Sequence, residues 1–324
     1  MNKWVILGCL CLVGCSGFQR AQPPTDVIPL AEQLGVVALE FNAAGTQFAT
    51  ASVRGEVSIW SFPEKRKLQK FWAHTGRIQG LFWAGDTYVM TGGDDRKIVL
   101  YDLTSGDVTA KTLQLDSSIN SLAYVPQRHW VVSGHLDGTV RAFQMPDLTP
   151  VGSYEMAETV VAVAASAQGV IAAAADGGQT LIFEQGLSNP RTLTASDRDA
   201  VELRFSQDGQ KLLGSGWKLL IWDVASGRLV TRNPGHLGSF SSLDISPDNR
   251  MMVTIGCQAD AKIHLFDFAT GELQRELAPH ELCGNAVRFN PSGQYVVTAS
   301  EDESVRFYDI TLPYQPEAVP YNGD

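Results

Sequence analysis

The sequence lacks a surplus of basic residues. It contains 25 Lys and Arg against 35 Asp and Glu, a formal net charge of -10 at pH 7. Proteins that neutralise nucleic-acid phosphates or bind anionic membranes through polybasic patches need cationic side chains, so the composition argues against both classes. The 44% hydrophobic fraction argues against intrinsic disorder and predicts a sizeable folded core.

Catalytic and metal-binding signatures are also missing. The six His residues form no His-x-x-x-His pair, and no Cys-x-x-Cys follows the first 15 residues, so no zinc site is predicted. No Gly-x-Ser-x-Gly motif or phosphate-binding glycine loop occurs. The acidic pairs Asp94-Asp95 and Glu301-Asp302 fall in repeat turns, which favours structural roles over acid-base catalysis. We therefore expect no enzyme activity, no metal and no cofactor.

Long hydrophobic runs are absent except at the N-terminus. Lys3 precedes an apolar stretch from Trp4 to Val13 that is too short to span a bilayer, a pattern typical of secretory signal peptides. The stretch ends in Leu12-Val13-Gly14-Cys15, which resembles a bacterial lipobox, whose Cys is lipidated and becomes the mature N-terminus. An ordinary signal peptide containing a Cys is the alternative.

The lipobox resemblance implies an N-terminal organisation. Residues 1–14 are the expected signal peptide, Cys15 the lipidation site, and residues 15–25, with two consecutive prolines, a tether. In that family a residue other than Asp after the Cys, here Ser16, implies the outer membrane. We expect a protein held in the bacterial cell envelope, facing the periplasm, that contacts the membrane through its lipid alone.

What is present is one pattern repeated seven times. Apolar strands separated by turns lead each time to a third strand that ends in an aromatic residue, with spacings of 39 to 44 residues. This period fits four-stranded propeller blades and not helical repeats of 33 or 34 residues. The aromatics are Trp60, Tyr101, Phe143, Phe183, Trp222, Phe266 and Tyr308.

The first turn of several repeats has hairpin chemistry. Ser246-Pro247-Asp248-Asn249 and Asn290-Pro291-Ser292-Gly293 place Pro where it presets the first torsion, and Asn or Gly where a positive φ is needed. The third strands are apolar on nearly every residue, as expected for sheets covered on both faces. These features predict an all-β chain.

Across residues 26–312 the pattern resembles the WD40 family, which implies a seven-bladed β-propeller. In that family a His, a strand hydroxyl, a turn Asp and the terminal Trp form a hydrogen-bonded tetrad. The matching positions are His74, Thr91, Asp95 with Tyr101; His236, Thr254, Asp260 with Phe266; and His280, Thr298, Asp302 with Tyr308. Because Phe cannot donate and Tyr donates from another position than Trp, we expect degenerate tetrads and less rigid blades.

The seventh repeat is one strand short, because three prolines follow Tyr308. An unassigned apolar piece, residues 26–31, precedes the first repeat. We predict that it supplies the missing outer strand and closes the ring. Residues 313–324 are left as a C-terminal tail.

Two cysteines, Cys257 and Cys283, remain in the body of the chain. They fall on the same face of adjacent repeats, in a compartment where a disulfide is permitted. A disulfide is possible, but two buried free thiols are favoured, since the sequence does not give the Cα separation that a bridge requires.

In the WD40 family, the loops before the first strand and between the second and third strands line one mouth of the central channel. Here these loops supply the candidate partner-binding residues Arg54, Arg77, Arg198, Trp217 and Phe240, of which Trp217 is the strongest. We predict a monomeric, lipid-anchored envelope scaffold that binds protein partners of unknown identity and no nucleic acid. The alternative is a small-ligand or glycan sensor, or an enzyme, that uses the channel.

Overall fold

The computed structural model describes residues 21–30, 35–104, 109–193, 200–232, 236, 239–257 and 261–313. Five predicted features lie wholly or mostly outside these residues and are not placed: the signal peptide, Cys15 with the start of the tether, Arg198, Asp260 and the tail from residue 314 onward.

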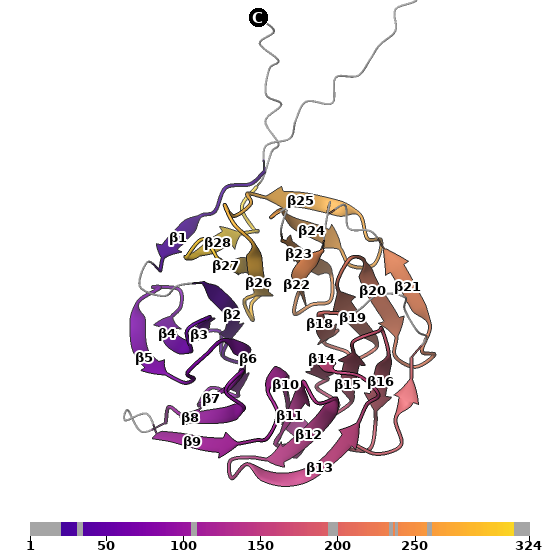
Figure 1. Cartoon of the computed structure of the whole chain (residues 1–324). Helices are drawn as coiled ribbons and strands as arrows, with labels where there is room; N and C mark the ends of the chain where they lie inside the picture. Colours follow the sequence, from indigo (N-terminus) through magenta and orange to yellow (C-terminus); the bar gives the residue numbers. More distant parts are fainter. Residues whose placement is uncertain are drawn as a thin grey trace, which may run out of the picture.

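Seven antiparallel four-stranded sheets surround a central axis (Figure 1), so the predicted all-β seven-bladed propeller is confirmed. The described residues also contain one 3-10 turn, η1 (Pro126–Arg128). The first four blades, from inner to outer strand, are β2 (Val36–Phe41), β3 (Gln47–Ser52), β4 (Glu56–Ser61) and β5 (Lys67–Trp72); β6 (Ile78–Ala84), β7 (Tyr88–Gly93), β8 (Lys97–Asp102) and β9 (Thr109–Gln114); β10 (Ile119–Val125), β11 (Trp130–His135), β12 (Thr139–Gln144) and β13 (Thr149–Glu155); β14 (Val160–Ala165), β15 (Ile171–Ala175), β16 (Thr180–Phe183) and β17 (Arg191–Thr192).

The last three blades follow the same plan. They are β18 (Glu202–Phe205), β19 (Lys211–Ser215), β20 (Leu219–Asp223) and β21 (Leu229–Arg232); β22 (Phe240–Ile245), β23 (Met251–Gly256), β24 (Ile263–Asp267) and β25 (Leu273–Leu277); and β26 (Gly284–Phe289), β27 (Tyr295–Ser300), β28 (Ser304–Asp309) and β1 (Asp26–Pro29). We number these blades 1 to 7 in chain order.

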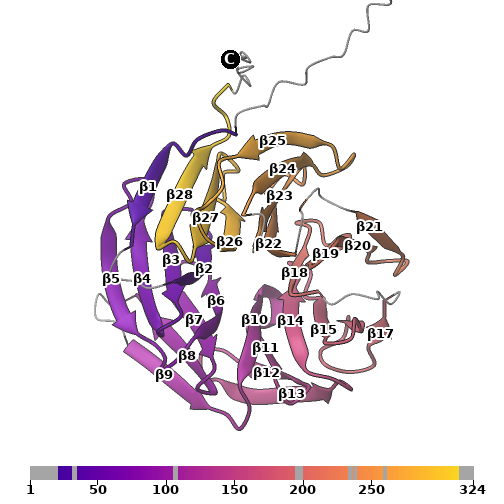
Figure 2. The ribbon, with the colours of Figure 1, turned by 45° about the horizontal axis from the view of Figure 1, so that its top comes forward.

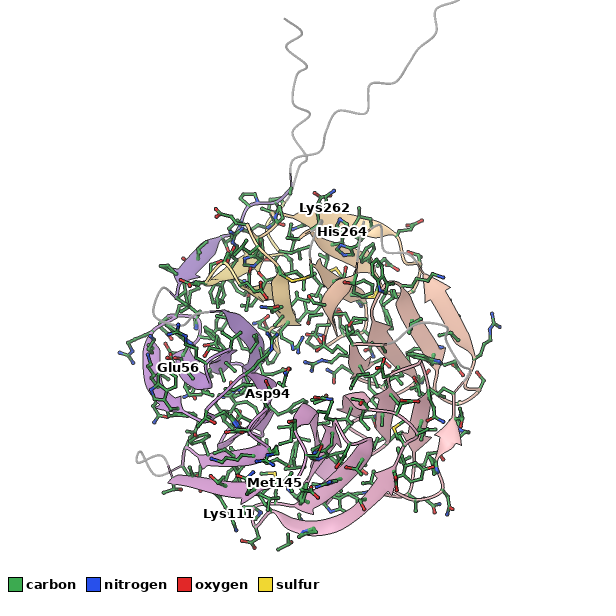
Figure 3. The ribbon with its side chains drawn as sticks, viewed as in Figure 1. Glu56, Asp94, Lys111, Met145, Lys262 and His264 are labelled. Atoms are coloured by element: carbon green, nitrogen blue, oxygen red, sulfur yellow. A yellow bond between two sulfur atoms is a disulfide. The ribbon has the colours of Figure 1, made fainter. Side chains whose placement is uncertain are left out.

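The hydrophobic core is divided into wedges between neighbouring blades. Each of the seven blade interfaces has its own buried cluster, such as the one that joins Val297 and Phe307 of blade 7 to Leu39 and Phe48 of blade 1. Side chains fill these wedges all round the ring (Figure 3). Because both faces of each sheet are covered, the apolar third strands are buried on both sides.

The aromatic residues that end the third strands are all buried, from Trp60 in blade 1 to Tyr308 in blade 7. They pack into the wedges. The predicted hairpin turns also form, with Asn249 at φ 57° and Gly293 at φ 73°. These two conformations explain why Asn and Gly stand at the turn ends.

An N-terminal strand closes the ring, as predicted. β1 pairs antiparallel with β28, from Asp26 opposite Phe307 to Pro29 opposite Ser304. Figures 1 and 2 show β1 beside β28 at the outer rim of blade 7. The outer strand of blade 7 is therefore supplied by the N-terminal segment, while its three inner strands come from the C-terminal part of the chain.

The predicted tether ends earlier than expected, because residues 21–25 are docked on the propeller. Gln22 forms a parallel bridge with Leu277 of blade 6, and its side chain donates to the Asp309 carbonyl at 3.0 Å. Thr25 donates from its amide and its hydroxyl to the Phe307 carbonyl. The propeller thus begins near residue 21, not residue 26, and this segment spans blades 6 and 7.

No helix in the described part of the chain is long and apolar enough to cross a bilayer.

Candidate functional site

One face of the propeller carries the loops that join consecutive blades and the loops between second and third strands. We call it the linker face. Five exposed large apolar side chains lie on it, at 51–63% exposure: Trp72, Leu136, Val201, Trp217 and Leu282. Trp72 is the last residue of the outer strand β5, and the other four lie in loops; among the described loops of the opposite face only Leu312 is comparable, and the remaining exposed large apolar residues lie within the outermost strands. The apolar surface outside the blade edges is therefore concentrated on the linker face.

The predicted partner-binding residues differ in how far they are exposed. Trp217 is 56% exposed in the loop between β19 and β20, and Arg54 is exposed in the corresponding loop of blade 1. Arg77 is half-buried and lines the central cavity. The structure thus places Trp217, Arg54 and Arg77 on the predicted face.

Phe240 was predicted wrongly. Its side chain is fully buried, packs in the cluster between blades 5 and 6, and stacks on the His236 ring with centroids 5.6 Å apart. As the first residue of β22 it is directed into the wedge. Its ring fills the hydrophobic wedge between blades 5 and 6 and is not available to a partner.

Trp72 is the residue that the sequence prediction missed. At 63% exposure it is the most exposed large apolar side chain in the described chain. It ends β5, directly before the Ala73-His74 pair that starts the next repeat. Its position at the end of the outer strand, just before the loop between blades, would have been the signal, since an aromatic that fills the space between blades stands at the end of a third strand.

The predicted tetrads form in part. His74 contacts Thr91 Oγ1 at 2.8 Å and Asp95 Oδ1 at 2.7 Å, and His280 contacts Thr298 Oγ1 at 2.7 Å and Asp302 Oδ2 at 2.9 Å. In blade 6 His236 contacts Thr254 at 2.9 Å. The acidic turn residues Asp95 and Asp302 therefore hold histidines in place.

The terminal tyrosines do not complete the tetrads as the family pattern implies. Tyr101 donates to the Trp72 carbonyl at 3.4 Å and Tyr308 to the Ala278 carbonyl at 2.6 Å, in each case two residues before the His. The longer reach of a phenol explains the change of acceptor. Blade 1 keeps the Trp contact, because Trp60 donates to Thr50 Oγ1 at 3.0 Å.

Burial and hydrogen bonding shift the pKa of these pairs. Burial lowers the pKa of His280, although the Asp302 carboxylate opposes the shift. Burial by itself would raise the pKa of Asp302, but hydrogen bonds from His280 and Ser304 hold it well below its usual range. Both shifts favour a neutral His beside an ionised Asp, a structural pairing.

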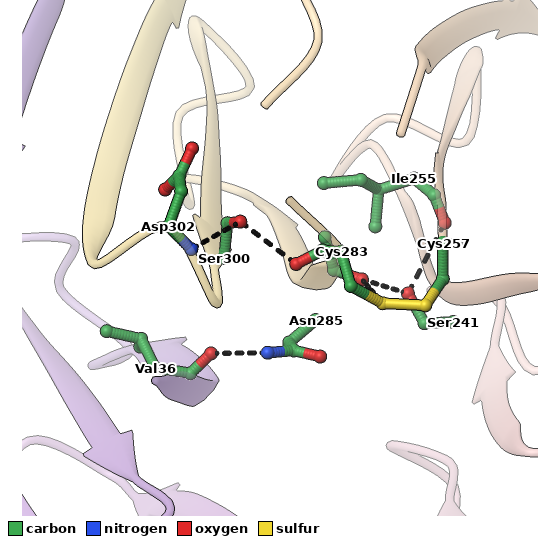
Figure 4. Close-up of a disulfide and its surroundings, with 9 residues drawn as sticks. Val36, Ser241, Ile255, Cys257, Cys283, Asn285, Ser300 and Asp302 are labelled. Atoms are coloured by element: carbon green, nitrogen blue, oxygen red, sulfur yellow. Dashed lines mark hydrogen bonds between the residues drawn. A yellow bond between two sulfur atoms is a disulfide. The ribbon is translucent and has the colours of Figure 1, made fainter. Parts of the chain in front are cut away.

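Cys257 and Cys283 are joined in a disulfide with their Cα atoms 4.4 Å apart, so the free thiols favoured from the sequence are not found. The bridge links blades 6 and 7 on the linker face (Figure 4). Beside it, Ser300 donates to the Cys283 carbonyl at 2.9 Å, and Asn285 donates to the Val36 carbonyl of blade 1 at 2.9 Å. The bridge forms because the two loops meet across the blade interface.

A cavity of about 1000 Å³ runs along the central axis. Its lining includes residues near the linker face, such as Arg77 and Asn285, and residues near the opposite face, such as Gly85 and Gln207. Figure 3 shows Asp94 toward the centre of the ring, whereas Lys111 lies at the outer rim. The lining therefore extends from one face of the propeller to the other.

Four charged side chains form a closed set of ion pairs in this cavity. Arg288 donates to Glu40 at 2.7 Å and to Glu202 at 2.8 Å, and Arg204 pairs with the same two carboxylates. The four residues come from blades 7, 1 and 5. The set therefore connects opposite sides of the ring, and we call it the ion square.

Burial and neighbouring charges shift the pKa values of the carboxylates in and beside the ion square. Burial would raise the pKa of Glu202, but Arg288 and Arg204 hold it below its usual value. A fifth charged residue, Asp244 of blade 6, accepts a hydrogen bond from the Phe289 amide at 2.8 Å. Burial raises the pKa of Asp244 to about 6, with Arg204 and Arg288 acting in the opposite direction.

None of these channel residues was singled out from the sequence. A signal was available in the repeats: Glu40, Arg204, Asp244 and Arg288 each stand two residues before the Asn or Ser that starts a first turn. In a ring of repeats, equivalent positions of different blades face the same part of the central cavity. No group of three or more His, Cys, Asp or Glu residues suited to a metal ion occurs among the described residues.

Comparison with known proteins identifies WD40 repeats. The family model "WD40: WD domain, G-beta repeat" matches residues 65–102, 109–144, 227–267 and 271–309. Each match runs from the outer strand of one blade to the third strand of the next. The sequence repeat is therefore offset by one strand from the structural blade.

Several curated proteins resemble the chain at low identity. "Periodic tryptophan protein 2" of Arabidopsis thaliana is 20% identical over 299 residues, covering 83% of this chain and 33% of that protein. "Pre-mRNA-processing factor 19 homolog 2" of the same organism is 27% identical over 233 residues, covering 67% and 42%. The chain thus spans about a third to two fifths of the length of these relatives, so their activities are not transferred to it.

Among solved structures, the β-propeller domain of Cps50 (Swd1) from Myceliophteria thermophila superposes with a TM-score of 0.77 at 15% identity, covering 89% of this chain and 99% of that one. This likeness concerns the fold. The chain contains WD40 repeats and folds as a seven-bladed WD40 propeller.

Proposed function

We propose that this protein is a lipid-anchored scaffold of the bacterial cell envelope that binds protein partners through its linker face. The observation that carries the proposal is the concentration of exposed apolar side chains on that face, with Trp72 and Trp217 the largest. Aromatic side chains dominate the binding energy of protein interfaces. WD40 propellers are suited to protein-protein interaction because their rigid ring holds many loops in fixed positions.

Two features support the envelope location. The Leu-x-Gly-Cys sequence that ends at Cys15 resembles a lipobox, and lipidation there would hold the chain at a membrane. The Cys257–Cys283 disulfide suits an oxidising compartment, since cytosolic thiols are usually kept reduced. The docked segment that begins near residue 21 would then join the anchor to the rim between blades 6 and 7.

Membrane fractionation tests the anchor. Wild type should sediment with membranes and release a lipid-modified N-terminal peptide on digestion, whereas Cys15→Ala should be soluble in the periplasm. A Cys15→Ala variant that still sediments with membranes, or a wild type without lipid, would contradict lipid anchoring.

Crosslinking capture from envelopes tests the binding face. Trp72→Ala combined with Trp217→Ala should lose the proteins captured by the wild type. Leu273→Ala removes a comparably exposed apolar side chain from the outer strand β25 and should retain them. Thermal melting of all variants checks that folding is intact. Capture that is equal for the double variant and wild type would place the binding surface elsewhere.

A further inference from the structure

The central cavity has two unlike walls. The ion square and Asp244 come from blades 5, 6, 7 and 1, whereas the lining from blades 2, 3 and 4 is largely apolar and aromatic, with Asn120, Ser121 and His129 among its polar members. The apolar wall includes Phe82, Leu122, Tyr124, Val161 and Val163. Small-molecule sites combine a mainly apolar lining with a few placed polar groups in volumes of roughly 300–1,000 Å³. At about 1000 Å³ the cavity lies at the upper end of that range.

The ion square leaves no guanidinium for an anionic ligand. Arg288 donates to Glu40, Glu202 and Ser242, and Arg204 to Glu40 and Glu202. The side chain of Arg288 is only 9% exposed. An anion would have to break these pairs, which costs more than a surface ion pair because the freed carboxylates stay partly buried.

Asp244 is the carboxylate that the ion square does not neutralise. It accepts a hydrogen bond from the Phe289 amide and makes no direct ion pair with a described residue, although Arg204 and Arg288 both lower its pKa. Around Asp244 the five charged side chains carry one negative charge in excess, with three carboxylates and two guanidinium groups; Arg77, the third guanidinium of the lining, lies toward the linker face. A cation is the chemistry that would complete the set.

The position of Asp244 also indicates the route of entry. It stands two residues before the turn that begins at Ser246, on the face opposite the linker face. Arg77 lines the cavity near the linker face, where its charge opposes the entry of cations. The Tyr124 hydroxyl and His129 Nδ1, 2.9 Å apart, line it near the opposite mouth. A cation would reach Asp244 more easily from the opposite face.

We propose that the central cavity binds a small organic cation, whose ammonium or guanidinium group pairs with Asp244 and whose apolar part packs on the wall formed by blades 2 to 4. This site is separate from the linker face and goes beyond the proposed scaffold function. A free amine and a basic side chain of a partner protein share this chemistry. Binding of the free compound to the isolated protein distinguishes the two sources.

The direct test is calorimetric titration of the mature, non-lipidated full-length chain with 2-phenylethylammonium at pH 7.5. Saturable binding is expected for wild type, with 2-phenylethanol and 3-phenylpropanoate failing to bind. Asp244→Asn should weaken binding by roughly tenfold or more, the loss of one charge-assisted hydrogen bond. Asp176→Asn, which neutralises an exposed carboxylate on the linker face, should bind as wild type.

The pH dependence provides a second readout. Because the pKa of Asp244 is about 6, affinity should fall as the pH is lowered from 7.5 to 5. Glu40, Arg204 and Arg288 also face Asp244, so the assignment depends on Asp244→Asn losing this dependence. Melting curves of Asp244→Asn check that the variant is folded.

Three results would overturn the proposal: no saturable binding to wild type, equal binding by Asp244→Asn, or equal binding of the alcohol. The linker-face variants separate the two proposals. Trp72→Ala with Trp217→Ala should keep amine binding even where protein capture is lost. If amine binding depends on those tryptophans, the cation belongs to the linker face and the cavity site is wrong.

Discussion

The two halves of the ring are held together differently. Blades 5, 6, 7 and 1 are connected by specific bonds: the ion square, the Cys257–Cys283 disulfide, the Asn285 contact to Val36, and the N-terminal segment across blades 6 and 7. Blades 2, 3 and 4 are connected by apolar packing, as in the alanine-rich strands β14 and β15, and by single hydrogen bonds such as that from Asn120 to the Val160 carbonyl; among the described residues no disulfide or buried ion pair joins them.

The difference follows from where the chain closes on itself. Blades 2 to 6 are each joined to both neighbours by continuous chain. Blade 7 meets blade 1 only through the docked N-terminal segment and side-chain contacts. Specific bonds near that junction compensate for weaker covalent connection. The disulfide and the buried ion pairs thus lie in the half of the ring that contains the closure.

Deleting residues 21–30 should have the largest effect, because it removes β1, uncovers the outer edge of β28 and takes Leu30 out of the wedge between blades 7 and 1. We expect loss of cooperative thermal unfolding. Val27→Ala, whose side chain is exposed, is the control and should change stability by less than about 0.5 kcal/mol. A normal melting transition for the deletion would show that closure does not need this segment.

Replacing one arginine in each half compares the two kinds of connection. Arg288→Met leaves Glu40 and Glu202 partly unpaired in the cavity and should lower the free energy of unfolding by about 3–5 kcal/mol. Arg141→Met in blade 3 breaks pairs with Asp137 and with Asp116, which is 80% exposed, and should cost less than about 1 kcal/mol. Urea denaturation measures both; equal costs would remove the distinction.

Removing the disulfide should have an intermediate effect. Cys257→Ser with Cys283→Ser opens a loop closed over 26 residues, and we expect a loss of about 3 kcal/mol. Reduced wild type should match the double variant in denaturant, and oxidised wild type should exceed both. If reduction leaves stability unchanged, the bridge contributes nothing to closure.

Replacing Asp244 should change stability with the opposite sign, and only at high pH. Its pKa is raised in the folded state, so its contribution to stability is present below its unfolded pKa and is lost as the pH rises through about 6. Asp244→Asn should therefore exceed wild type by roughly 3 kcal/mol at pH 7.5 and nearly match it at pH 4. A constant difference across this pH range would show that Asp244 does not titrate as described.

The blades and their closure were predictable because their determinants are local. The spacing of Trp60, Tyr101 and the later aromatics, together with turns such as Ser246–Asn249, gives the period and the strand order. Counting the strands of each repeat showed that the seventh lacks an outer strand, and this predicted that residues 26–31 supply it. Burial of the aromatics then results from covering each sheet on both faces.

The site was less predictable because it combines residues from distant repeats. The pairing of Arg204 with Glu40 joins positions 164 residues apart, and the exposure of Trp72 as against the burial of Phe240 depends on how each loop leaves its strand. The disulfide depended on two loops meeting across a blade interface. None of these distances follows from a repeat period.

Site-specific photo-crosslinking in intact envelopes tests the central claim, binding through the linker face, most directly. A photoreactive residue would replace Trp72 or Trp217 on that face, Leu312 on the opposite face, or Leu273 on an outer strand. The proposed function predicts shared crosslinked partners at positions 72 and 217 and none at 312 and 273. Partners that crosslink only from positions 312 or 273 would contradict it.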